Sequence, residues 1–179
     1  MELVPFYQLH ECRYMVYWNL VSQSDLAEQQ KKLAEQEQKQ MELDAVTLDR
    51  VICGEQQPEP DHFMEMLNSN TGSDEDLHWR EARDNGWFSY LMKTQTDTVA
   101  QIRIVYKGLP SRDATVWVND VKVGTLTSVV SNELSISEFA LPQALQGEKQ
   151  LRVKIGTATS KGTVRIYEVR LVKNAEPTK

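Results

Sequence analysis

Short apolar segments separated by turn signals fill residues 86–172, and this spacing constrains the fold most. In residues 99–106 (VAQIRIVY) apolar and other side chains alternate, which is typical of a half-buried strand. Residues 114–118 and 121–126 flank Asn119-Asp120, a pair that tolerates the positive φ angles of a two-residue hairpin turn. The pattern predicts a mainly β fold, a jelly-roll β-sandwich over residues 45–173. Further strands are expected at 86–93, 148–155 and 163–172, and a short helical turn at 141–147.

A polar stretch precedes the strands and predicts a long helix over residues 22–44. It is rich in Gln, Glu, Lys and Ala and contains neither Gly nor Pro. Ser22 or Ser24 can cap its start. A narrow apolar stripe runs along it, so a linker helix lying on a domain surface and a coiled-coil partner helix both remain open. The stripe consists of Ala27, Ala34, Met41 and Leu48.

Residues 3–18 (LVPFYQLHECRYMVYW) are unusually apolar for the start of a chain, beginning with Leu3 and ending with Trp18. Chain ends tend to be polar and loosely held, so we interpret residues 1–21 as a terminal strand segment of a preceding β-sandwich. An exposed apolar edge invites association. We therefore expect this segment to fold back onto the jelly roll or to pair with another copy in a homo-oligomer. Residues 174–179 are expected to form a disordered tail.

Composition and charge argue against several classes of protein. The net charge of −6 argues against nucleic acid as a partner. No apolar run approaches the roughly 18 residues that span a membrane, so no membrane partner is expected. The chain shows no P-loop, no dinucleotide fingerprint and no G-x-S-x-G motif, and we expect no cofactor.

Candidate metal ligands are scattered. His10, His62 and His78 lack the spacing of a zinc site. Cys12 and Cys53 are too few for a disulfide framework, so buried free thiols are expected, with a single disulfide as the alternative. The acidic run at residues 73–76 lacks the EF-hand spacing for calcium, which favours a solvated loop.

A cluster of aromatic residues carries the candidate binding site. Flat rings suit the apolar faces of sugars, and arginine can reach hydroxyl or carboxylate groups. The competing interpretation is a sandwich core in which an arginine stacks on a tryptophan. The candidates for carbohydrate binding are Trp79, Arg80, Trp87, Tyr90 and Trp117.

Several strings together resemble the C-terminal, non-catalytic region of bacterial proteins of glycoside hydrolase family 127, the β-L-arabinofuranosidase family. The first is the segment at residues 3–18, which resembles the passage that follows the catalytic barrel. The others resemble the accessory sandwich of such proteins. They are GEQQPEPDH at 54–62, HWREARDNGWFSY at 78–90, VWVNDVKVGTL at 116–126 and VRIYEVRLVK at 164–173.

The resemblance implies a role rather than a reaction. In that family a cysteine nucleophile works in a zinc site inside an (α/α)6 barrel, and no part of this chain matches the barrel. No catalytic residue can be carried over, and Cys12 and Cys53 fall in the wrong region. The resemblance implies an accessory module that packs against and supports the catalytic domain of a periplasmic or secreted parent.

Two alternatives belong to other classes. One is a carbohydrate-binding module that holds a plant-type oligosaccharide on exposed tryptophans. The other is a stand-alone interaction protein that uses the apolar stripe between Ala27 and Met41.

Overall fold

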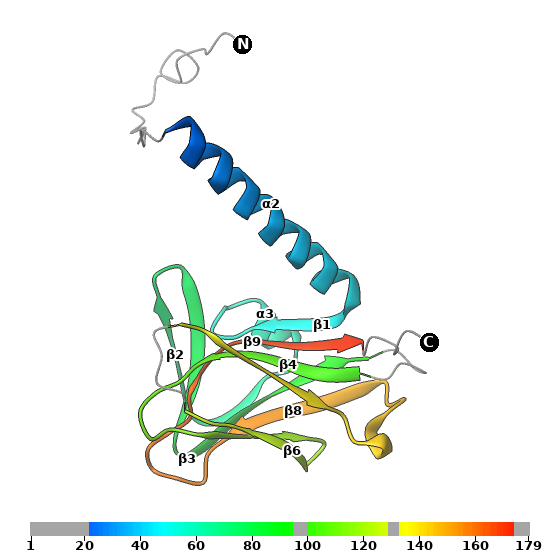
Figure 1. Cartoon of the computed structure of the whole chain (residues 1–179). Helices are drawn as coiled ribbons and strands as arrows, with labels where there is room; N and C mark the ends of the chain where they lie inside the picture. The colour runs from blue at the N-terminus through cyan, green and yellow to red at the C-terminus, as the bar shows by residue number, and fades with distance from the viewer. Residues whose placement is uncertain (1–21, 95–99, 129–132, 174–179) are drawn as a thin grey trace, which may run out of the picture. The chain divides into compact units, whose positions relative to one another are not determined.

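The computed structural model describes residues 22–94, 100–128 and 133–173 (Figure 1). The chain divides into two compact units, Met1–Met41 and Glu42–Lys179. The terminal strand expected within residues 1–21 and the tail expected at residues 174–179 lie outside the described residues.

The predicted long helix is present as α2, Gln23–Val46. Ser22 caps it, because its Oγ accepts the backbone N–H of Asp25 at 3.1 Å. The apolar stripe along the helix is shorter than the sequence predicted. Its last member, Leu48, lies in a strand and packs against the sandwich core. No described helix is long and apolar enough to cross a membrane.

The described residues of the second unit form one antiparallel sheet of nine strands (Figure 1). The strands follow the order β6-β5-β8-β3-β9-β4-β7, while β1 pairs with β9 and β2 with β3. The elements are β1 (Thr47–Ile52), α3 (Pro58–Asp61), β2 (Glu65–Asp74), β3 (Leu77–Lys93), β4 (Ala100–Lys107), β5 (Ala114–Val118), β6 (Val121–Leu126), β7 (Ser135–Ala140), the 3-10 turn η1 (Gln143–Leu145), β8 (Gln150–Gly156) and β9 (Arg165–Lys173).

The long strand β3 joins two layers of the sheet into a jelly-roll β-sandwich, as predicted. Its second half pairs with β8, from Trp87 opposite Gly156 to Lys93 opposite Gln150. Its first half meets β9 at Arg80. In Figure 1, β1, β9 and β4 run side by side, and β8 and β6 lie in the other layer.

Side chains that alternate along the strands fill the space between the layers. Ile102 and Ile104 of β4 are fully buried, and Tyr106 is nearly so, as the alternation predicted. At the edge of the sandwich β6 and β7 approach closely. A Cβ on Gly124 would lie 2.1 Å from the Phe139 ring, so any larger residue would force this ring to move.

The hairpin and the helical turn were predicted at the right places. Asn119 and Asp120 connect β5 to β6 with φ angles of 45° and 63°. The turn expected within 141–147 is the 3-10 turn η1. No alternating pattern in the sequence predicted four further stretches of strand, which are β1, β2, β7 and the first half of β3.

Candidate functional site

Three of the five candidate binding residues lie in the interior. Trp79 is 8% exposed, Arg80 5% and Tyr90 fully buried. Arg80 forms a two-point ion pair with Glu59, through Nε to Oε1 at 2.7 Å and through Nη2 to Oε2 at 2.6 Å. Tyr90 Oη donates to the same Oε1 at 2.7 Å. Through Glu59, Arg80 and Tyr90 thus hold α3 to the sheet.

Hydrogen bonds keep the buried carboxyl group of Glu59 ionised. Burial alone raises the pKa of Glu59, but bonds from Arg80, the Gly54 N–H and Tyr90 outweigh it, so the pKa lies below its usual value. Glu59 is therefore an ionised carboxylate held by an ionised guanidinium. Cys53 beside it is a buried free thiol, as expected, and burial raises its pKa. Cys12 lies outside the described residues.

Trp79 packs in the manner that the competing interpretation predicted, with Arg165 as the stacking partner. The Arg165 guanidinium lies 4.1 Å from the centre of the Trp79 ring and donates to both oxygens of Asp74 at 3.0 Å. Tyr167 also donates to Asp74, at 2.7 Å, and lowers its pKa. Trp79 Nε1 is near Asp74 but forms no hydrogen bond of normal geometry. Asp74, expected in a solvated loop, instead anchors the end of β2.

The two remaining candidates, Trp87 and Trp117, are half-buried and lie on the outer face of one layer. Their neighbours along the strands, Phe88 and Val116, point into the core, which directs both tryptophans away from it. The Lys154 ammonium lies over both rings, 4.6 Å from the centre of Trp87 and 5.8 Å from that of Trp117. We call these three side chains the tryptophan–lysine face.

Strand register explains how this face forms. Lys154 of β8 stands between Trp117 of β5 and Ser89 of β3, its partners across the two strand pairs. Trp87 lies two residues before Ser89 on β3, opposite Gly156 of β8. Because Gly156 has no side chain, the ring of Trp87 has room above β8. A Cβ on Gly156 would come within 2.8 Å of the Trp87 Cβ.

Arg152 extends the same face along β8. Its Nη1 donates to Ser89 Oγ at 3.1 Å and to the Phe63 carbonyl at 3.4 Å, and it pairs with Glu65 at 3.4 Å. Neither Arg152 nor Lys154 was among the sequence candidates. The signal that could have found them is the alternation of 150–156, in which Leu151, Val153 and Ile155 face inward.

The described residues contain no group of three His, Cys, Asp or Glu side chains arranged to hold a metal ion. His62 has a structural role instead. Its Nδ1 lies 2.6 Å from the Pro58 carbonyl oxygen and its Nε2 3.0 Å from Asp49 Oδ1. The ring thus connects α3 to β1.

Solved structures with a similar fold include carbohydrate-binding modules. A family 35 module from Clostridium thermocellum aligns with a TM-score of 0.52 and 10% identity, over 68% of this chain and 96% of the module. A family 6 module of Cellvibrio mixtus lichenase 5A, solved with cellotriose, gives 0.52 and 10% over 72% and 99%. A Podospora anserina β-(1,4)-mannanase with a family 35 module gives 0.55 and 10%, over 74% of this chain and 29% of the enzyme. At this identity the similarity establishes the fold alone.

The chain belongs to the DUF6805 family, a family of unknown function, which it matches over residues 42–172. No curated protein matches the chain.

Proposed function

We propose that residues 45–173 form a non-catalytic carbohydrate-binding accessory module whose ligand lies on the tryptophan–lysine face. The observation that carries this proposal is the pair of half-buried rings, Trp87 and Trp117, on the outer side of the β5-β8-β3 layer. Indole rings offer a large rigid apolar surface with a polar edge, which suits the mixed surface of a sugar. That several carbohydrate-binding modules share the fold supports the choice of ligand.

The separation of the rings indicates an oligosaccharide rather than a single sugar. Strand β8 lies between the strands that carry Trp87 and Trp117. The partners of these residues on β8, Gly156 and Lys154, are two residues apart. Strand spacing and rise place their Cα atoms about 10 Å apart across the strands and about 7 Å along them. The rings are thus separate platforms, each suited to a different unit of the ligand.

The test is a titration with neutral plant oligosaccharides, followed by tryptophan fluorescence and calorimetry. We expect Trp87→Ala and Trp117→Ala each to weaken binding at least about tenfold, as loss of a central tryptophan does in other interfaces. Ile136→Ala is the matched control, because Ile136 is an exposed apolar residue on β7 in the other layer. Saturable binding that both tryptophan variants retain would refute the site.

The parent protein is a second part of the proposal. The strings at residues 3–18, 54–62 and 78–90 support a parent glycoside hydrolase of the β-L-arabinofuranosidase type, in which this module packs against and supports the catalytic domain. We expect no turnover of arabinofuranosides by this chain, and turnover above the blank would contradict the accessory role.

The apolar segment at residues 3–18 is proposed to be covered in the isolated chain, by the jelly roll or by a second copy. Hydrogen exchange combined with sedimentation velocity tests this. We expect its amides to be protected, whereas fast exchange in a monomeric chain would refute the proposal.

A further inference from the structure

Cations follow the outer face of the β3–β8 pair beyond the tryptophans. Residues opposite each other on antiparallel strands share a face, and the pairs here are Ser89 with Lys154, Leu91 with Arg152, and Lys93 with Gln150. From Trp87 onward this face therefore presents Lys154, then Arg152, then Lys93. These three cations, with the tryptophans at one end, define what we call the basic track.

The basic track carries an excess of positive charge on an acidic protein. The whole chain has a net charge of −6. Within the described residues, Lys93 and Lys154 form no ion pair with a carboxylate, and the partner of Arg152 is Glu65, which is 59% exposed. The Lys154 ammonium contacts only ring faces among the charged and aromatic groups described, so it has no counter-ion.

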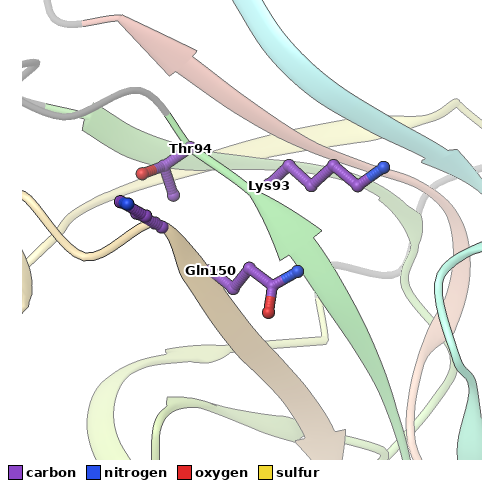
Figure 2. A pocket seen from close by; sticks show the side chains of 4 residues that line it. Lys93, Thr94 and Gln150 are labelled. Carbon is purple, nitrogen blue, oxygen red and sulfur yellow. The ribbon is translucent and has the colours of Figure 1, made fainter.

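A hollow of about 460 Å³ forms the far end of the basic track. It is lined by Lys93, Thr94, Lys149 and Gln150. Figure 2 shows the side chains of Lys93 and Gln150 extending to the same side of the β3–β8 pair. Like Lys93, Lys149 forms no ion pair with a described carboxylate. Gln150 lies four positions before Lys154 on β8, which is about 14 Å along the strand.

We propose that the ligand is an anionic oligosaccharide that lies along the basic track, from Trp87 and Trp117 to the hollow beside Lys93. This inference rests on the proposed carbohydrate-binding function and specifies its ligand class. Carboxylate or sulfate groups of the ligand pair with Lys154, Arg152 and Lys93 while its rings stack on the tryptophans.

Lys154 makes the face selective for charge. Its ammonium already lies over both rings, held by cation–π attraction. A neutral sugar has to displace this ammonium and offers no counter-charge in return. An anionic sugar accepts the ammonium as an ion-pair partner, so the contact that Lys154 loses with the rings is replaced.

The experiment compares each anionic ligand with a neutral derivative of the same sugar backbone. Calorimetric titrations use trigalacturonate and its fully methyl-esterified form, and a κ-carrageenan tetrasaccharide and its desulfated form. One exposed ion pair strengthens binding by up to about fivefold, so at least one anionic ligand should bind about fivefold tighter than its neutral counterpart. The preference should shrink as salt is raised from 20 to about 300 mM, because exposed pairs are screened. The carboxylate and sulfate arms identify which anion is recognised.

Variants locate the effect. Lys154→Gln should lower the ratio of anionic to neutral affinity, and an unchanged ratio would contradict the role of Lys154. Lys39→Gln, which removes an exposed cation from α2, should change neither affinity. Equal binding of charged and neutral ligands would overturn this inference and leave the carbohydrate-binding function standing. Absence of binding by all four ligands at millimolar concentration would overturn the inference, and the neutral panel above then decides the function separately.

Discussion

Replacing Glu59 with glutamine tests whether the interior cluster is structural. Glu59 is 4% exposed, and its carboxylate accepts four hydrogen bonds. In Glu59→Gln the side-chain carbonyl can keep the bonds at the Oε1 position, from the Gly54 N–H, Tyr90 and Arg80 Nε. The new amide NH2 then faces Arg80 Nη2, a donor against a donor, and the negative charge is lost.

The expected cost follows from the charge left behind. Arg80 is 5% exposed and has no second carboxylate partner among the described residues. Removing one partner of a buried ion pair costs about 3–5 kcal/mol, a large share of the roughly 5–15 kcal/mol that stabilises a domain. The double variant Glu59→Leu/Arg80→Met removes both charges, and we expect it to recover only part of the loss, because Tyr90 Oη and the Gly54 N–H still lose their acceptor.

Urea unfolding followed by circular dichroism measures the effect. The midpoint of Glu59→Gln should fall while the dependence on urea stays constant, since the same surface is exposed on unfolding. Glu138→Gln is the control, because Glu138 is 49% exposed and lies 3.6 Å from Arg103, so it should cost no more than about 1 kcal/mol. A loss below about 1 kcal/mol in Glu59→Gln would refute the argument.

Three further predictions concern packing, backbone conformation and pH. Gly124→Ala should lower the free energy of unfolding by about 1–3 kcal/mol in a thermal melt, because the added methyl group meets the Phe139 ring. An unchanged melting temperature would contradict this close approach. Phe63 has a φ of 46° and is 65% exposed, so Phe63→Asn should leave stability unchanged or raise it by up to about 1 kcal/mol, and a clear loss would show that the ring packs. The folded-state pKa values of Glu59 and Asp74 lie below their ordinary values of 4.5 and 3.8. Their contribution to the free energy of unfolding is therefore present at neutral pH and lost as pH falls below those values. As the pH is lowered, the stability of Glu59→Gln should fall less steeply than that of the wild type.

The sequence predicted the parts of the fold that local physics determines. Alternation in β4 and the Asn119-Asp120 turn located strands and hairpin, because each signal acts within a few residues. It missed β2, whose residues 65–74 lie on an exposed edge and need no alternation. It also missed the first half of β3, because Arg80 and Glu81 appear polar in sequence yet are buried by partners far along the chain.

For the same reason, the sequence could not decide which of the candidate residues face outward. Trp79 and Trp87 are alike in sequence context, but only strand pairing decides that Arg165 covers the first and that the second faces outward beside Gly156. Lys154 gains its importance from register alone, since β5 and β3 bring Trp117 and Ser89 to its two sides.

The most direct test of the central claim is the NMR spectrum of the tryptophan indole N–H groups during titration with a binding oligosaccharide. The chain has four tryptophans, each giving one indole signal. We predict that the signals of Trp87 and Trp117 shift and saturate together, while that of Trp79, stacked beneath Arg165, stays in place. Saturable binding in which Trp87 and Trp117 do not shift would contradict the account.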